Sequence, residues 1–569
     1  MPLCSRFKIT NSNFLKYFLI FFVAFYLFFI LQTVSQTLLC PDSFYHAKMA
    51  SFLAEGRLIK NFPWLPYTIF SHSYIDHHFL YHLLLIPFVT VFYPLFGIKI
   101  ATAFFASITI VVFYWFLKKF KIKFPFLWTF LLITSSVFLT RLNLAKVPAA
   151  AIPVLLLGLA ALFKRKYVLL SIMAFTYVWL YNTWPILVVA VFIYCFASAL
   201  KKIIENWELF KSCPDAPLIS VNKNKEVGIP TLRREKLVIG NFLKYLFAKE
   251  NIGLILSCSF GIICGLVINP YFPQNIYFDW IHIVQIGLKN YQGILPVGAE
   301  WYSYDPIHLI FDNPLILLPW LISIGWLVFS LKKREGVTVF GQSVKSISLS
   351  IFSLLFFIYT MKSRRNVDYF IPIATLACAF SFNNLLSNLP WRSYFNEFKK
   401  FTKDIYLNLV TAILGLSVLT LLIFSGVSLY KDVWLAKKSE FGGGANFNRF
   451  RGAADFLKEN VRPDEIIFHS SWDEFPALFY HNDQNYYIAG LDPTFSYEEN
   501  KPLYWLWFNI VTARQNKNLA QVIKNKFNSR YVFIKADRKE LKKNFDENYD
   551  FEKIFEDSDG LIYKIKNDK

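Results

Sequence analysis

Long runs of apolar residues, separated by short basic loops, constrain the fold of this chain more than any other feature. Residues 15–39 are long enough to cross a hydrocarbon core of roughly 30 Å as a helix. With 55% hydrophobic residues, the chain has more apolar side chains than a soluble protein buries. We therefore predict a polytopic α-helical membrane protein with about 11–13 spans. Further apolar runs occupy 79–117, 124–140, 147–163, 167–199, 252–268, 314–331, 346–361, 367–386 and 405–430.

The composition becomes polar after the glycines at 442–444 and stays polar to the end. Helix and strand patterns then alternate, which is typical of a small α/β domain with a mixed sheet. We therefore divide the chain into a multi-span domain, 1–440, and a soluble α/β domain, 446–569. The second domain has no glycine-rich phosphate-binding motif after a strand, so no nucleotide site is predicted.

The formal charge of +21 comes mainly from loops between spans, not from a basic soluble domain. This distribution indicates membrane topology and excludes nucleic acid as a partner. The basic loops, including the long 200–250 segment, hold about 25 Lys and Arg, against about 6 in the alternate loops. We expect the run 79–117 to break at Gly97. The alternation of loop charge holds only if this run crosses the membrane an odd number of times. One of its two helical pieces then lies in the membrane interface or re-enters the membrane.

This charge count predicts an integral plasma (inner) membrane protein with a cytoplasmic N-terminus. The less basic loops at 40–78, 141–146, 269–313 and 362–367 then share the extracytoplasmic face with the C-terminal domain. Most of the charged residues that are candidates for chemistry fall in these loops.

Asp42 and His46 lie in the segment PDSFYHAKMASFLAEG, which predicts a short helix that stops at Gly56. Their spacing puts them on one face of that helix. Asp42 is either the cap of the helix or a reactive carboxylate, and His46 is either an interfacial aromatic residue or a substrate contact.

Asp76, His77 and His78 follow in YIDHHFLYH, where His78 and His82 have a spacing compatible with a metal on a helix. With carboxylates nearby, an oxygen-bound Mg²⁺ or Mn²⁺ is favoured over zinc, and its expected ligands are Asp42 and Glu300. The alternatives are solvated or interfacial side chains.

Cationic residues occupy the same predicted face. Arg364 and Arg365 stand at the start of a span on the side that otherwise avoids basic residues, which favours phosphate binding over lipid headgroup contact. Arg141 is a further candidate for substrate binding. In the C-terminal domain, Trp472 and Asp473 either belong to the core and cap a helix, or bind an acceptor.

Together these residues resemble the GT-C superfamily of polyprenyl-phosphate-sugar-dependent glycosyltransferases, which includes the protein mannosyltransferases and the oligosaccharyltransferase catalytic subunits. Asp42 matches the essential aspartate of the first extracytoplasmic loop, and Glu300 is similar to the glutamate of a later catalytic loop. Arg364 and Arg365 are similar to the phosphate-contacting arginines, and Trp472–Asp473 shares the WD of WWDYG. The chain departs from oligosaccharyltransferases at Lys146, where an acid is expected.

The resemblance implies a glycosyltransferase that moves a hexosyl or pentosyl group from a polyprenyl-phosphate donor to a glycan, lipid or protein acceptor outside the membrane. Asp42, Asp76 and Glu300 are its expected catalytic residues. Its expected substrate-binding residues are His46, His77, His78, Arg141, Arg364, Arg365, Trp472 and Asp473. Transfer of a whole oligosaccharide, secondary transport and a non-catalytic membrane role remain as alternatives.

Overall fold

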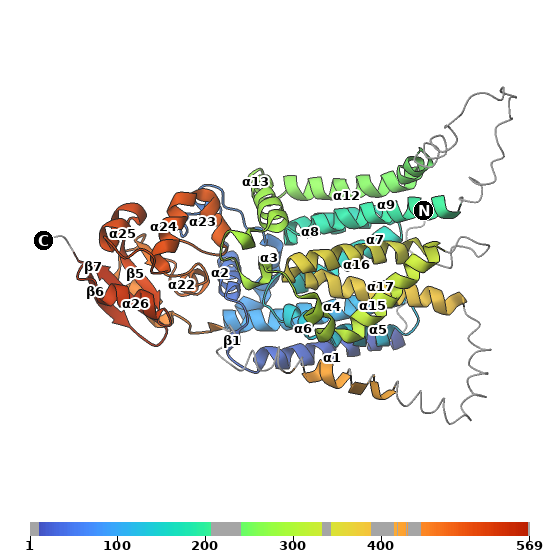
Figure 1. Ribbon diagram of the computed structural model, residues 1–569, viewed down its shortest axis with the longest axis horizontal. Coiled ribbons are helices and arrows are strands. Elements are labelled where there is room, and N and C mark those ends of the chain that lie inside the picture. The colour runs from blue at the N-terminus through green and yellow to red at the C-terminus, as the bar shows by residue number, and fades with distance from the viewer. Residues whose placement is uncertain are drawn as a thin grey trace, which may run out of the picture.

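A computed structural model describes residues 11–205, 240–332, 343–388 and 445–566, with short pieces between 415 and 430. A bundle of long helices makes up one part of the molecule, and an α/β domain built from the C-terminal residues lies at one end of it (Figure 1). The glycines at 442–444, most of the basic 200–250 loop and most of the apolar run 405–430 lie outside the described residues.

Within the described residues, six helices are long and apolar enough to cross a membrane, or up to eight if each of two bent helix pairs is one span. The chain is therefore a polytopic helical membrane protein. The six are α1 (Asn11–Thr33), α4 (Pro94–Lys119), α9 (Pro185–Glu205), α12 (Lys249–Val267), α16 (Val344–Lys362) and α17 (Val367–Asn388). The bent pairs are α5 (Pro125–Ile133) with α6 (Ser136–Leu142), and α14 (Pro306–Asp312) with α15 (Pro314–Lys332).

Among the fully described segments, three shorter apolar helices also belong to the bundle: α3 (Phe79–Val91), α7 (Pro148–Phe163) and α8 (Tyr167–Leu180). The sequence prediction of about 11–13 spans counts such short segments as crossings. The apolar run 167–199 is divided into two helices, because α8 ends before Tyr181 and α9 begins at Pro185.

The run 79–117 is divided as expected, but the break lies at Phe92–Tyr93 and not at Gly97. Gly97 instead lies where α4 passes so close to the Phe88 carbonyl that a Cβ would collide with it. Only α4 is long enough to be a span, since thirteen residues of α3 rise about 20 Å. One full crossing in this run agrees with the odd number that the loop charges require.

The C-terminal domain is built on a mixed five-stranded sheet with the order β4-β3-β5-β7-β6, as the alternating pattern predicts. Strand β3 pairs in parallel with β4 and β5, while β5, β7 and β6 pair antiparallel. The strands are β3 (Ile466–His469), β4 (Tyr486–Tyr487), β5 (Ser529–Lys535), β6 (Phe551–Glu556) and β7 (Gly560–Ile565). The helices are α21 (Arg451–Asn460), α22 (Phe475–His481), α23 (Pro493–Glu499), α24 (Lys501–Val511), α25 (Leu519–Phe527) and α26 (Lys539–Asp546).

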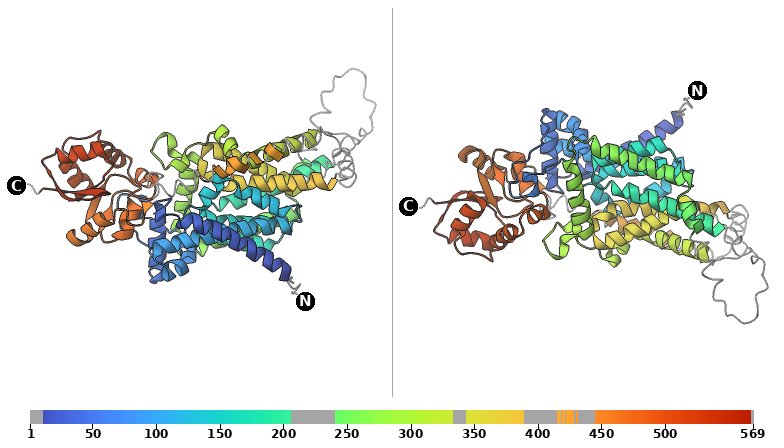
Figure 2. Two further views of the ribbon diagram at one scale, coloured as in Figure 1. Left: turned by 90° about the horizontal axis from the view of Figure 1, so that it is seen from below. Right: turned by 90° about the horizontal axis from the view of Figure 1, so that it is seen from above.

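The first loop of the membrane domain, residues 40–78, and the strand just before it contact the C-terminal domain. Strand β1 (Thr37–Leu38) pairs antiparallel with β2 (Ala445–Asn446). Helix α2 (Asp42–Ala54) packs against α22, and the Trp64 indole donates a 2.7 Å hydrogen bond to the Asp483 carbonyl. The first loop therefore lies between the two domains, as the position of α2 in Figure 1 and the two turned views of Figure 2 show.

Candidate active site

A polar cavity of about 100 Å³ opens where the bundle meets the C-terminal domain. Its walls come from segments that are far apart in the sequence: helix α2, the α6–α7 loop, the loop before α14, the turn before α17 and the loop before α23. The charged side chains that line it are Asp42, Arg141, Lys146, Glu300, Arg365 and Asp492. Four of these segments belong to the loops whose common face was predicted from charge.

Asp42 is the first residue of α2, and Gly56 follows its end with a φ of +77°, as expected for a stop. The alternative that Asp42 caps the helix is wrong, because the N-cap residue is Pro41. Within the described residues, no side chain forms a capping hydrogen bond at this end of α2. The Asp42 carboxylate instead faces the cavity, where its Oδ2 lies 2.8 Å from Lys146 Nζ. His46 lies one turn later and lines the same cavity.

Lys146 lies between two carboxylates, because its Nζ is also 3.6 Å from Glu300 Oε1. Burial lowers the pKa of Lys146, but the charges of Asp42 and Glu300 more than offset this and hold it well above its ordinary value. A permanent ammonium therefore fills the space between Asp42 and Glu300. These two residues do not fit a shared Mg²⁺ or Mn²⁺, since the cation would have to displace a charge already paired with both.

Glu300 is surrounded by three cations. Arg141 Nη1 lies 2.8 Å from its Oε2, and Arg365 Nη1 lies 3.8 Å from its Oε1. Burial raises the pKa of Glu300, but Lys146 and the two arginines bring it well below its usual range. Glu300 is thus an anion that organises the cations, and not a carboxyl ready to take up a proton.

Arg141 is held by acids on both sides. Besides Glu300, its Nε and Nη2 donate to the two oxygens of buried Asp368, at 2.6 and 2.9 Å. This bidentate pair fixes the guanidinium plane. Arg141 lines the cavity, but its Nε, Nη1 and Nη2 donors are already paired with Asp368 and Glu300, and its predicted role in substrate binding stays a prediction.

The two adjacent arginines differ in position. Arg365 lines the cavity, donates a 2.6 Å hydrogen bond to the Tyr181 hydroxyl and lies 4.2 Å from the centre of the Trp301 ring. Arg364 is exposed and donates to the Ser303 carbonyl at 3.0 Å, outside the cavity walls that the structure describes. Of the pair, only Arg365 is placed to meet a ligand there.

Neutral imidazoles form another wall of the cavity. Burial lowers the pKa of His77 to about 4, and burial with neighbouring histidines lowers the pKa of His46 and His78 well below the ordinary value. His282 on η2 (Ile281–Lys289) also lines the cavity, and burial lowers its pKa as well. These side chains offer lone pairs and N–H donors without charge at neutral pH.

Besides Arg364, three residues predicted from the sequence lie away from the cavity. Asp76 is buried, and its carboxylate accepts hydrogen bonds from His82 Nδ1 at 2.7 Å and from the His78 backbone at 3.0 Å. Trp472 and Asp473 do not belong to the described residues that line the cavity. Asp473 does not cap α22, because the N-cap residue of that helix is Glu474. The Oδ2 atom of Asp473 lies 4.0 Å from Arg449 Nη2.

Sequence reasoning did not select Lys146, Asp368, His282 or Asp492 for the site. Asp492 had a detectable signal, because Asp followed by Pro is typical of a helix start, and its side chain does accept from the Thr494 N–H at 2.8 Å. Burial raises the pKa of this carboxyl, which lines the cavity from the C-terminal domain. Lys146 was noted only as a departure from the oligosaccharyltransferases, at a position where an acid is expected.

A second, apolar cavity of about 420 Å³ lies next to the polar one. Three residues, His282, Trp301 and Arg365, line both. The apolar cavity runs between α9 and α16, two of the membrane-spanning helices, with side chains such as Ile186, Val189, Leu355 and Phe356 on its walls.

Solved structures with this arrangement of helices are known. Archaeal oligosaccharyltransferase AglB from Archaeoglobus fulgidus, in complex with an inhibitory peptide and a dolichol-phosphate, has a TM-score of 0.55 at 14% identity, covering 92% of this chain and 70% of that one. ArnT from Cupriavidus metallidurans bound to undecaprenyl phosphate has a TM-score of 0.53 at 12% identity, covering 97% and 98%.

The arabinofuranosyltransferase AftD from Mycobacteria is similar over 96% of this chain and 40% of its own, with a TM-score of 0.52 and 10% identity. The chain has a GT-C-like fold. No family model matches the sequence, and no curated protein matches it either. The GT-C-like fold is therefore visible in the arrangement of the helices and loops.

Proposed function

We propose that the protein is an integral-membrane glycosyltransferase that moves a sugar from a polyprenyl-phosphate donor to an acceptor on the extracytoplasmic side. The observation that carries the proposal is that a polar and an apolar cavity lie next to each other and share three lining residues. An apolar cavity between spanning helices suits a polyprenyl chain, and the polar cavity beside it suits a phosphate and a sugar. AglB and ArnT, which share the fold, are known with dolichol-phosphate and undecaprenyl phosphate.

In this proposal Arg365 holds the donor phosphate, because its side chain lines both cavities and its contact with Glu300 is long, at 3.8 Å. Guanidinium binds phosphate oxygens through paired N–H donors, and this stabilises the charge that develops on the leaving phosphate. Glu300 and Asp368 orient the arginines without taking part in proton transfer.

Asp42 is the proposed base. Its carboxylate faces the cavity and accepts the proton of an acceptor hydroxyl, whose oxygen forms a bond to the anomeric carbon as the bond from that carbon to the phosphate oxygen breaks. A single displacement of this kind inverts the anomeric centre. Lys146 keeps the Asp42 carboxylate oriented toward the reacting groups through its 2.8 Å ion pair.

The test is sugar transfer by the purified full-length protein in lipid, with a panel of radiolabelled polyprenyl-phosphate sugars and a membrane extract as the source of acceptors. Asp42→Asn is expected to abolish release of polyprenyl phosphate while the protein still inserts and purifies normally. Asp305→Asn is the matched control, since Asp305 caps α14 on the surface and Asn caps equally well. Full turnover by Asp42→Asn, or no release by the folded wild type from any donor, would overturn the proposal.

A further inference from the structure

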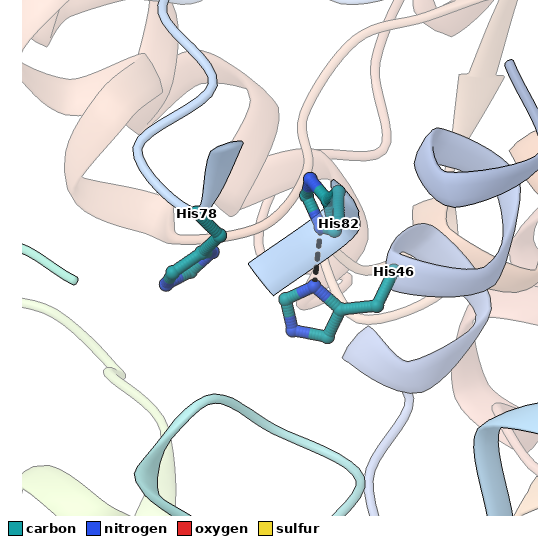
Figure 3. A group of neighbouring side chains, drawn as sticks. All are labelled: His46, His78 and His82. Atoms are coloured by element: carbon teal, nitrogen blue, oxygen red, sulfur yellow. Dashed lines mark hydrogen bonds between the residues drawn. The ribbon is translucent and has the colours of Figure 1, made fainter. Parts of the chain in front are cut away.

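Three histidines, one from α2 and two from the start of α3, converge beside the cavity. His46 lies on α2, His78 immediately precedes α3, and His82 lies one turn into α3. One ring nitrogen of each lies within 4.8 Å of the others, and His46 Nδ1 is 2.8 Å from His82 Nε2. Figure 3 shows the hydrogen bond between His46 and His82, with His78 beside them.

A buried carboxylate orients one of these histidines. Asp76 Oδ2 accepts from His82 Nδ1 at 2.7 Å, and both side chains are almost completely buried. The proton on Nδ1 leaves the Nε2 lone pair of His82 pointing at His46. A carboxylate behind the remote nitrogen of an imidazole is the usual support of a metal-bound histidine, because it sets the tautomer and raises the basicity of the ligand.

His78 distinguishes a metal site from a chain of hydrogen bonds. The bonds Asp76–His82–His46 satisfy two of the three histidines. They leave His78 Nδ1 buried without a hydrogen-bond partner among the described residues. A buried polar atom without a partner costs about 1–3 kcal/mol, so it requires an explanation. A cation shared by three imidazoles would give all three rings a partner.

We propose that His46, His78 and His82 bind a divalent transition-metal ion of the Zn²⁺ type, with Asp76 supporting His82. Three nitrogen ligands select Zn²⁺, Co²⁺, Ni²⁺ or Cu²⁺ over Mg²⁺ and Mn²⁺, which prefer oxygen. Bonds of about 2.0–2.1 Å bring the nitrogens of a tetrahedral site to about 3.4 Å apart, so small side-chain rotations close the group around the ion.

The site is separate from the carboxylates that the sequence suggested as metal ligands, and it does not depend on the proposed transfer reaction. His46 and His78 line the polar cavity, whereas His82 lies behind them. Three protein ligands leave a fourth position of a tetrahedral ion for a small molecule, and the two lining histidines place the ion at the cavity wall.

The test measures metal directly. The full-length protein, purified through a tag without histidine, is stripped with chelator, loaded with Zn²⁺, desalted and analysed by elemental mass spectrometry. One tightly held zinc per chain is expected. Loading with Co²⁺ is expected to give the intense visible absorption of a tetrahedral site.

Variants locate the ion. His78→Gln and His82→Gln are each expected to lose the bound zinc, and Asp76→Asn to weaken it by about 10–100-fold. His308→Gln is the control, because His308 is exposed on α14. If a variant fails to fold, the Co²⁺ spectrum of the wild type still decides. No stoichiometric zinc in the wild type, or undiminished zinc in folded His78→Gln and His82→Gln, would overturn the proposal and leave a hydrogen-bond chain.

Discussion

The Lys146 ammonium lies 2.8 Å from Asp42 Oδ2 and belongs to a loop more than a hundred residues further along the chain. The same ammonium is 3.6 Å from Glu300, so one lysine links the acids of two other loops. A position between two carboxylates is one where Mg²⁺ or Mn²⁺ could bind. In this chain a side chain supplies the positive charge.

Lys146→Met is expected to lower the catalytic efficiency of sugar transfer by roughly 10²-fold or more, because two carboxylates then share a cavity without the cation between them. We further expect added Mg²⁺ or Mn²⁺ to restore part of the lost activity in this variant, since both carboxylates become free to bind it. Initial rates measured over a range of added Mg²⁺ or Mn²⁺ check both points.

Lys48→Met is the matched control for Lys146→Met. Lys48 lies on the same helix as Asp42, but its 3.1 Å ion pair is with Asp483, outside the cavity as the structure describes it. Its loss is expected to leave transfer unchanged. A wild-type enzyme that is inactive until Mg²⁺ or Mn²⁺ is added would contradict the role given to Lys146.

Arg365→Gln is expected to weaken binding of polyprenyl phosphate by about 10–100-fold, the effect of losing a hydrogen bond to a charged group worth about 1.5–3 kcal/mol. The neighbouring variant Arg364→Gln is expected to bind normally, because the Arg364 side chain is exposed and bonded to the Ser303 carbonyl. Equilibrium binding of radiolabelled undecaprenyl phosphate to the two purified variants compares them. Equal losses in both would show that the two arginines act together, contrary to the geometry.

The contrast between Arg364 and Arg365 also marks the limit of sequence reasoning. Loop charge and apolar length depend on composition over many residues, so the helices, the mixed sheet and the common face of the loops are predictable. The face shared by Asp42 and His46 follows from helix periodicity alone. Which of two adjacent arginines turns inward depends on Tyr181 and Trp301, whose nearness no local pattern encodes.

The same limit applies to Asp76. Its position next to two histidines suggested a reactive carboxylate. In the structure, however, the Asp76 carboxylate is hydrogen-bonded to His82 and does not line the cavity. A helical turn between residues 78 and 82 was foreseeable, while the approach of His46 from α2 required the packing of α2 on α3. Ion pairs and clusters built from separate loops therefore became visible only in three dimensions.

Asp279 gives the protein a pH-dependent stability. Burial raises its pKa to about 6, although the Trp184 and Asn182 side chains donate to it at 3.1 and 3.3 Å. An unfolded Asp ionises near 3.9, so the unfolded state holds fewer protons between about pH 4 and 6, and stability falls as pH rises through this range. The difference corresponds to about 3 kcal/mol.

Asp279→Asn removes this ionisation. Its unfolding free energy relative to wild type is expected to rise between about pH 4 and 6 and to stay constant above about pH 7. Thermal midpoints of both proteins across this range provide the measurement. Asp537→Asn is the control, because Asp537 is 62% exposed and its pairing with Lys535 lies on the surface. A difference between Asp279→Asn and wild type that does not vary with pH would contradict the assigned ionisation.

A close contact between helices α8 and α12 yields the last prediction. A Cβ on Gly261 of α12 would collide with the Ser171 carbonyl of α8, and the Ser171 hydroxyl already donates a 2.6 Å hydrogen bond to the Ser257 carbonyl at the same interface. Gly261→Leu is therefore expected to push the helices apart and to lower the free energy of unfolding by about 1–3 kcal/mol or more.

Gly325→Leu is the matched control, since a Cβ there meets no atom within 4 Å in the described part of the chain. Thermal unfolding of the detergent-purified variants should show a lower midpoint for Gly261→Leu alone, and equal midpoints would mean that α8 and α12 are less closely packed than the structure has them.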